Sequence, residues 1–141
     1  MHEPSPFPVA FRHPLRVYWE DTDAGGVVFY ANYLKFFERA RTEWLRSLGI
    51  GQQALMEREG VIFVVAETSL RCLRPARLDD LLEVSVAVAG AGRASLRLQQ
   101  QARRDAELLA EGDIRIGCVA RDTAAQLRPC RIPATILEKL P

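Results

Sequence analysis

One long helical pattern in the first third of the chain, followed only by strand-like segments and short turns, limits the possible folds most. Apolar residues recur every three or four positions from Asn32 to Leu48, which is the period of an amphipathic helix. This apolar stripe consists of Tyr33, Phe36, Phe37, Ala40, Trp44 and Leu48. We interpret the stripe as core packing rather than as a cofactor site, because a sheet needs a helix to cover one of its faces.

The segments on either side of this helix predict one antiparallel sheet. A short strand is expected at 15–19, a second helix at 52–59, and a last helix at 134–140. After Gly60, segments rich in β-branched residues predict strands at 61–74, 81–89, 93–104 and 108–120, with a hairpin turn at Gly90 to Gly92. Within 96–101, leucines and Gln100 alternate with Arg97, Gln99 and Gln101, which is typical of a sheet with one face exposed to water. The order predicts an α+β fold in which the sheet wraps around the helix.

Length, charge and cysteine content narrow the class of protein. A chain of 141 residues that is 48% hydrophobic predicts a single globular domain, which we place at 13–141 after a flexible, proline-containing arm at 1–12. The net charge of +1 gives no electrostatic case for nucleic acid, and no apolar run reaches the roughly 18 residues of a membrane span. Cys72, Cys118 and Cys130 form no Cys-x-x-Cys pair, so we expect reduced thiols in a soluble cytoplasmic protein, with neither a disulfide framework nor a metal site.

The residues that join the first predicted strand to the long helix carry the candidate chemistry. This run is Asp21-Thr22-Asp23-Ala24-Gly25-Gly26-Val27-Val28-Phe29-Tyr30-Ala31-Asn32-Tyr33. The two glycines permit backbone angles closed to other residues, so a bend there can place Asp23 beside the first exposed N–H groups of the helix. Those donors, with the positive end of the helix dipole, suit a developing oxyanion. The alternative is that both aspartates only cap a turn or a helix.

The same run resembles the signature of hotdog-fold acyl-CoA thioesterases. The likeness covers nearly the whole chain after residue 12. It is strongest in Tyr18 to Val28 and extends through Tyr33-Leu34, Glu38 to Glu43, Pro75-Ala76-Arg77-Leu78-Asp79-Asp80 and the closing Arg128 to Pro133. More narrowly, it is similar to the Tol-Pal-associated acyl-CoA thioesterases and to hydroxybenzoyl-CoA thioesterase. The resemblance implies a hotdog fold and hydrolysis of an acyl-CoA thioester without a metal or a bound cofactor.

The resemblance also implies roles for single residues. It places Asp23 at the catalytic carboxylate, either attacking the thioester carbonyl or drawing a proton from water, and a backbone N–H near Tyr30 as the donor that polarises the carbonyl. Asp21 then either holds the loop by accepting backbone N–H bonds or faces solvent. Many Tol-Pal-associated members have histidine where this chain has Tyr30, whereas the hydroxybenzoyl-CoA relatives have tyrosine there. Hydrolysis is therefore implied, but a histidine relay at this position is not.

Other catalytic assignments receive less support from the residues. Glu38 and Glu43 on the long helix are alternatives for the catalytic acid, because another branch of hotdog thioesterases uses a helical carboxylate. Most such acids are solvated or paired with a nearby arginine. A serine hydrolase is not indicated, because no Gly-x-Ser-x-Gly motif occurs, and His2 and His13 both precede the motif and are expected at the surface.

The remaining expectations concern substrate and partners. Substrate contacts are expected at Gly26 and Val27, and the phosphates of coenzyme A at Arg93 and Arg77, although either arginine could be an ordinary surface charge. The acyl tunnel is expected to include Phe29, Phe63 and Val65 and to be built from two protomers, since hotdog proteins form dimers and often tetramers. The alternative function is a non-catalytic binding module for acyl thioesters or acyl carrier protein. A dehydratase of the same fold is disfavoured because its histidine and acid pair is missing.

Overall fold

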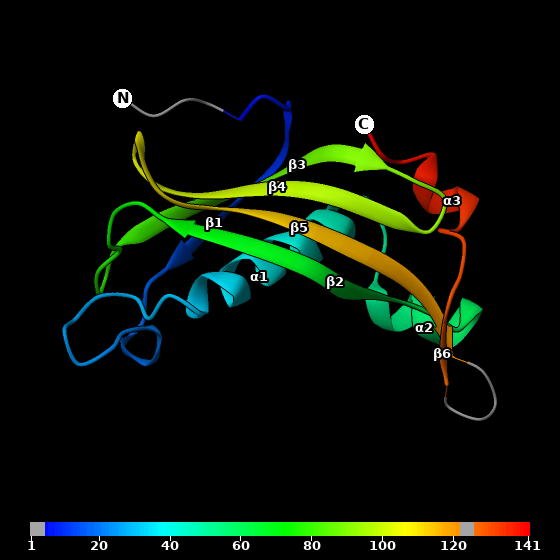
Figure 1. Cartoon of the computed structure of the whole chain (residues 1–141), viewed down its shortest axis with the longest axis horizontal. Helices are drawn as coiled ribbons and strands as arrows, with labels where there is room; N and C mark the ends of the chain where they lie inside the picture. Colours follow the sequence, from blue (N-terminus) through cyan, green and yellow to red (C-terminus); the bar gives the residue numbers. More distant parts are fainter. Residues whose placement is uncertain (1–4, 122–125) are drawn as a thin grey trace.

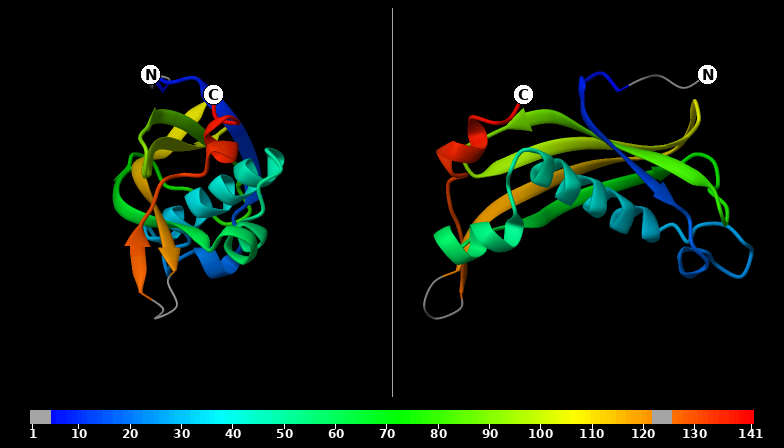
Figure 2. Two further views of the ribbon diagram at one scale, coloured as in Figure 1. Left: turned by 90° about the vertical axis from the view of Figure 1, so that its right-hand side faces the viewer. Right: turned by 180° about the vertical axis from the view of Figure 1, so that it is seen from behind.

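The structure is a computed structural model that describes residues 5–121 and 126–141. The chain forms, in order, β1 (Val9–Arg16), the 3-10 helix η1 (Trp19–Asp21), α1 (Asn32–Ser47), α2 (Gln52–Glu59), β2 (Val61–Cys72), β3 (Leu81–Ala91), β4 (Ser95–Arg104), β5 (Glu107–Arg121), β6 (Leu127–Pro129) and α3 (Ala134–Leu137). One antiparallel sheet in the order β1-β3-β4-β5-β2, with β6 added to β5, curves around α1 (Figures 1 and 2). The predicted α+β architecture is confirmed.

The apolar stripe of α1 faces the sheet and forms the centre of the core. Phe36, Phe37 and Ala40 are fully buried, and the sheet curves around one side of the helix when the molecule is viewed from its end (Figure 2, left). α1 can lie this close to β5 because Gly112 has no side chain where the ring of Phe37 meets the strand. The helix thus fixes the position of its own N-terminus, where the candidate loop begins.

Gln100 is buried on the face of β4 that meets the helix, as the alternation in the sequence predicted. Gln101, expected on the face exposed to water, is only 4% exposed, and its side chain is hydrogen-bonded to Glu111 and Arg103. Gln100 donates from Nε2 to the backbone oxygens of Phe37 and Ser85, at 3.0 and 3.3 Å, and its Oε1 accepts from Nη1 of Arg41 at 3.0 Å. Burial lowers the pKa of Arg41. A buried amide with all these partners stabilises the contact between α1 and the sheet rather than weakening it.

The N-terminal part of the chain departs from the prediction. β1 begins at Val9 and ends at Arg16, so residues 9–12, which were expected in a flexible arm, belong to the sheet, and 17–19 do not continue the strand. Pro14 is tolerated because β1 is an edge strand and needs ladder hydrogen bonds on one side only. Ser5 donates to the side chain of Gln99, so this segment also contacts β4. Residues 1–4 of the predicted arm, including His2, lie outside the described residues.

The bounds of the remaining helices and strands agree with the prediction in some cases and differ from it in others. α2 matches its predicted range, and Gly60 follows it in the left-handed conformation that ends helices. The β3–β4 turn falls later than expected, since β3 includes Gly90 and the turn follows Ala91. β6 was not predicted, and α3 ends at Leu137 rather than at residue 140. Within the described ranges, no helix has the length and apolar character needed to cross a membrane.

Candidate active site

The loop between β1 and α1 is folded back on itself by hydrogen bonds centred on Asp21. The Asp21 side chain is only 4% exposed, and its Oδ2 accepts a hydrogen bond from the Tyr18 backbone N–H at 2.8 Å. The Asp21 backbone oxygen accepts from the N–H of Phe29 at 3.0 Å and from Nδ2 of Asn32, the first residue of α1, at 2.8 Å. Asp21 therefore has the structural role that was the first of its two predicted alternatives, and Asn32 is a loop clamp that the sequence reasoning missed.

Asp23 lies at the exposed tip of this loop. Its Oδ1 accepts hydrogen bonds from the backbone N–H groups of Gly25, at 2.8 Å, and Val27, at 3.4 Å. The loop closes through the Asp23 N–H, which donates to the Val27 oxygen at 2.9 Å, and through the Gly26 N–H, which donates to the Asp23 oxygen at 3.0 Å. The carboxylate is thus oriented by loop amides. Both donors belong to the loop itself, which is common for aspartate in tight turns.

Steric constraints explain why both of these positions in the motif are glycine. Gly26 has a φ of +77°, a conformation that disfavours residues with a side chain. A Cβ at Gly25 would lie 3.2 Å from Oδ1 of Asp23, so any side chain there would push against the carboxylate. The two glycines together let the loop turn tightly enough for its own amides to hold Asp23.

The start of α1 offers backbone donors next to this loop. The N–H groups of Asn32, Tyr33 and Leu34 donate to the oxygens of Phe29, Tyr30 and Ala31, at 2.8, 3.2 and 3.1 Å. Within residues 5–121 and 126–141, the N–H groups of Tyr30 and Ala31 have no protein acceptor. These amides sit at the positive end of the α1 dipole. They can therefore donate to an oxygen atom of a bound molecule.

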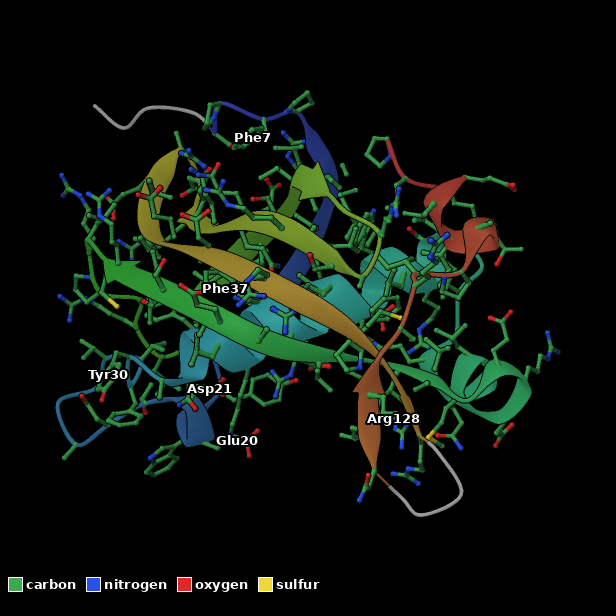
Figure 3. The ribbon with its side chains drawn as sticks, turned by 45° about the vertical axis from the view of Figure 1, so that its right-hand side comes forward. Phe7, Glu20, Asp21, Tyr30, Phe37 and Arg128 are labelled. Carbon is green, nitrogen blue, oxygen red and sulfur yellow. The ribbon has the colours of Figure 1, made fainter. Side chains whose placement is uncertain are left out.

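The Tyr30 side chain is exposed beside a hollow at the end of β2. The Tyr30 ring is tilted against that of Phe29, with centroids 4.9 Å apart, and Tyr30 as a whole is 63% exposed. The hollow has a volume of about 230 Å³ and reaches from Tyr30 and Val28 to Cys72 and Pro75. Figure 3 shows Tyr30, Asp21 and Glu20 at the same end of the molecule, with Arg128 of β6 at the other end.

A second loop, 73–80, supports the first. The Ala76 N–H donates to the Tyr33 hydroxyl at 3.2 Å, and the Ala76 oxygen accepts from the Val28 N–H at 2.8 Å. Tyr33 is 2% exposed, and burial raises the pKa of its hydroxyl. A backbone bridge between Val27 and Arg77 extends this contact. The supporting role of this loop was not predicted from the sequence, because its partners lie about 50 residues away along the chain.

The supporting loop is itself fixed by charged groups. Asp80 accepts from the Arg77 N–H at 2.8 Å, and its Oδ2 also lies 2.7 Å from Nη1 of Arg104. Arg104 pairs with Glu107 at 2.5 Å, and the hydrogen bond to Asp80 raises the pKa of the guanidinium. The Val17 N–H donates to the Asp80 oxygen at 2.8 Å, which ties the end of β1 to the same loop. The end of β1 and the β4–β5 turn therefore both hold loop 73–80, which in turn supports the Asp23 loop.

The structure brings together most, but not all, of the predicted site residues. Asp23, Gly26, Val27 and Tyr30 share one loop, and Arg77 is bridged to Val27. Arg93 lies in the turn between β3 and β4, at the opposite end of the sheet (Figure 1). Its backbone oxygen accepts from the Ile132 N–H at 2.7 Å, close to α3. Within one chain, Arg93 therefore cannot contact a ligand at Asp23 as an ordinary neighbour would.

The alternative acids on α1 have local partners. Glu38 accepts from the Thr42 hydroxyl at 2.8 Å, and Glu43 pairs with Arg46 at 3.3 Å. Glu38 also borders a cavity of about 150 Å³ between α1 and the sheet, whose apolar wall includes Phe63 and Val65. Phe29, expected with them in a tunnel, does not border this cavity within one chain and packs against Tyr30 in the first loop. Among the described residues, no cluster of three or more His, Cys, Asp or Glu side chains is arranged to hold a metal ion.

Comparisons with known proteins agree with this architecture. The model of the thioesterase-like superfamily matches residues 17–140. The acyl-CoA thioesterase YbgC of Haemophilus influenzae is 40% identical over 89% of this chain and 90% of its own length. The acyl-CoA thioester hydrolase YbgC of Escherichia coli O157:H7 is 43% identical over 90% of this chain and 92% of its own. A probable thioesterase from Bartonella henselae superposes with a TM-score of 0.78 at 32% identity, over 86% of this chain and 98% of its own.

The matched region includes the Asp23 loop, α1, the supporting loop and all strands from β2 to β6. A match this long cannot come from one shared motif, because it requires the same order of elements throughout the domain. The hotdog arrangement of one helix inside a curved antiparallel sheet, expected from the resemblance, is thereby confirmed. The chain belongs to the thioesterase-like superfamily.

Proposed function

We propose that this protein is an acyl-CoA thioesterase that hydrolyses an acyl-CoA thioester to the free acid and coenzyme A. Two relatives named for this activity align with almost the whole chain at 40% and 43% identity. The observation that carries the proposal is chemical. One loop holds a carboxylate, Asp23, and leads directly to backbone donors at Tyr30 and Ala31 that have no acceptor in the described part of the chain.

The proposed mechanism uses these two features in one step. The thioester carbonyl oxygen accepts hydrogen bonds from the free N–H groups at the start of α1, which stabilise the negative charge that develops on this oxygen. Asp23 either attacks the carbonyl carbon or takes a proton from the attacking water. Collapse of the tetrahedral intermediate expels the coenzyme A thiolate. If Asp23 is the nucleophile, this leaves an anhydride between the acyl group and Asp23, which water then hydrolyses to the free acid; if Asp23 is the base, the free acid forms directly. Because the donor is a backbone group, the exchange of histidine for Tyr30 leaves this part of the mechanism intact.

The rest of the binding site is assigned by position. Gly26 and Val27 follow Asp23 in the loop and are proposed to contact the thioester. Arg77 is bridged to Val27 and exposed, so its guanidinium is proposed to bind a phosphate group of coenzyme A. The cavity bordered by Phe63 and Val65 is the proposed start of the acyl pocket.

Arg93 requires a second protomer for its proposed role at the coenzyme A phosphates. β2 is an edge strand whose only ladder partner in the described sheet is β5, so its other side presents unpaired backbone groups to a neighbouring chain. We propose a homodimer joined at this edge, with a tetramer as its further assembly. Acyl carrier protein is a proposed partner. Three free thiols fit the proposed cytoplasmic location.

The test measures coenzyme A release from a panel of short-chain, long-chain and aromatic acyl-CoAs by wild type and Asp23→Asn. We expect wild type to hydrolyse at least one substrate and Asp23→Asn to lose about a hundredfold or more in kcat, the size typical of a positioned acid or base. Glu138→Gln is the control, because Glu138 is an exposed acid just after α3, at the end of the sheet opposite the loop (Figure 1). The oligomeric state of each variant is measured by light scattering.

Two outcomes would overturn parts of the proposal. If Asp23→Asn hydrolyses as fast as wild type, the catalytic carboxylate is another group, and Glu38 and Glu43 are the next residues to replace. If wild type binds acyl-CoA but releases no thiol from any substrate, the protein is a binding module and not an enzyme.

A further inference from the structure

Two of the three cysteines meet at the end of the sheet opposite the Asp23 loop. The Sγ atoms of Cys118, on β5, and Cys130, just after β6, are 3.3 Å apart. Cys118 is 1% exposed and belongs to the apolar core, whereas Cys130 is half-buried and packs against that core. β6 and the end of β5 lie far from the loop that joins β1 to α1 (Figure 1). The pair is therefore separate from the proposed active site.

The backbone around this pair is suitable for a covalent link. In the β5–β6 ladder Val119 faces Pro129, so Cys118 and Cys130 are the next opposed residues. The Cys130 N–H donates to the Cys118 oxygen at 2.9 Å, which fixes their register. Opposed residues of antiparallel strands have Cα atoms about 4.5–5.5 Å apart, inside the range of about 4.4–6.8 Å that disulfides require. Only a small change of the side-chain torsions is then needed to bring the sulfur atoms from 3.3 Å to bonding distance.

We propose that Cys118 and Cys130 form a reversible intramolecular disulfide, with a low-molecular-weight disulfide as the oxidant. The thiolate of Cys130 attacks one sulfur of the small disulfide, whose S–S bond breaks and releases one thiol. Cys118 then gives up its proton and attacks the Cys130 sulfur, which releases the second thiol and forms the protein S–S bond. Two protein thiols are oxidised and one small disulfide is reduced to two thiols, so atoms and electrons balance.

The order of the two attacks follows from the surroundings of the two cysteines. Cys130 is the more exposed of the two residues, whereas burial and the contact with Cys130 raise the pKa of the Cys118 thiol to about 12. A buried thiol is a poor first nucleophile but can act once its neighbour carries a leaving group in direct contact. Cys72 is exposed on β2, near Tyr30, and does not belong to this pair.

The bond would attach the C-terminal segment to the sheet. After Cys130 this segment buries Ile132 and Ile136 in the core. The Ile132 N–H also donates to the Arg93 oxygen at 2.7 Å, and the Cys118 N–H donates to the Ala94 oxygen at 2.8 Å. The disulfide would therefore stabilise both the C-terminal segment and the β3–β4 turn that carries Arg93.

The experiment oxidises the full chain with glutathione disulfide at a series of ratios to reduced glutathione. Remaining thiols are then blocked with iodoacetamide, and intact mass and peptide maps are recorded for wild type, Cys72→Ala and Cys130→Ala. We expect Cys72→Ala to become lighter by two hydrogen atoms, to take up no iodoacetamide, and to yield a linked peptide that contains Cys118 and Cys130. Its melting temperature should rise by about 5–10 °C and return on addition of dithiothreitol.

One variant serves as the control, and three results would overturn the proposal. Cys130→Ala should keep an unmodified Cys118 and show no rise in melting temperature, because the more exposed of the two cysteines is gone. The proposal is overturned if Cys72→Ala retains two alkylated thiols at every ratio, or if it stops as a glutathione adduct on Cys130. It is also overturned if the only disulfide in wild type involves Cys72. None of these readouts uses thioesterase activity, so failure of the proposed function would not affect them.

Discussion

Gly112→Ala is a sharp test of the packing between α1 and the sheet. A Cβ at this position would lie 2.9 Å from Cε2 of Phe37 and 3.0 Å from the backbone oxygen of Ser69, both shorter than ordinary van der Waals contact. Phe37 is fully buried between α1 and the sheet, and the Ser69 oxygen belongs to β2, so neither can move freely (Figure 3). Relief requires a shift of helix or strand, which costs about 1–3 kcal/mol for one additional methyl group in a tight core.

The expected effect on melting follows from this range. For a domain of this size each kcal/mol corresponds to about 3–5 °C, so Gly112→Ala should melt roughly 3–15 °C below wild type. Gly117→Ala is the control on the same strand, because its nearest contact, with Val64, is 3.9 Å away. That variant should be neutral or gain up to about 1 kcal/mol, since alanine restricts the unfolded chain more than glycine does.

Calorimetry and urea unfolding of both variants, at one protein concentration and with the same oligomeric state, provide the measurement. The double variant Gly112→Ala with Phe37→Leu removes the Cε2 atom, so the two changes should couple favourably rather than add. The packing argument is wrong if Gly112→Ala is as stable as wild type, or if Gly117→Ala is destabilised equally.

Two further predictions concern the loop and the response to pH. Asp21→Ala should lose about 1–2 kcal/mol of stability and lower kcat/KM, because the buried acceptor of the Tyr18 N–H is removed, whereas the exposed neighbour Glu20→Ala should change neither. If Asp21→Ala and Glu20→Ala have equal effects in melting and hydrolysis assays, this role for Asp21 is contradicted. In the alkaline range, burial raises the pKa of Tyr33, and raises that of Cys118 from 9.0 to about 12. The unfolded chain then loses these protons first, so stability should fall as pH rises above about 9. Between pH 8 and 11, the urea midpoint should fall less steeply with pH for Cys118→Ala than for wild type. If the two slopes are equal, Cys118 is not a source of this pH dependence.

Local patterns in the sequence were sufficient to predict the two main helices and the four long strands of the fold. The helical period from Asn32 predicts α1 to within one residue of its end at Ser47, and Gly60 marks the end of α2. These predictions succeed because helix periodicity and helix-ending glycines depend on residues a few positions apart. β1 was placed too late in the chain and β6 was missed, because each is an edge segment that contains proline and depends on a partner strand.

For the candidate site, the sequence pointed to a set of residues but not to the contacts that hold them. The Asp21–Tyr30 loop stands out in the sequence by its acids and glycines, and its assignment as the catalytic loop stays a prediction. Asn32, Tyr33 and Ala76 belonged to the motifs noted in the sequence but received no role in holding the loop, because their hydrogen bonds form only when segments more than ten residues apart are packed together. The role of Asp21 was left open for the same reason.

The sequence by itself therefore determined the α+β class, the order of helix and strands, and the loop that carries Asp23, since these depend on composition and short-range spacing. Only the tertiary structure decided which groups support that loop, that Arg93 lies at the opposite end of the sheet, and that Cys118 meets Cys130. These facts depend on strand register and on which ends of the strands coincide. Register is set by the side chains that the whole sheet buries against α1, and no short stretch of sequence contains that information.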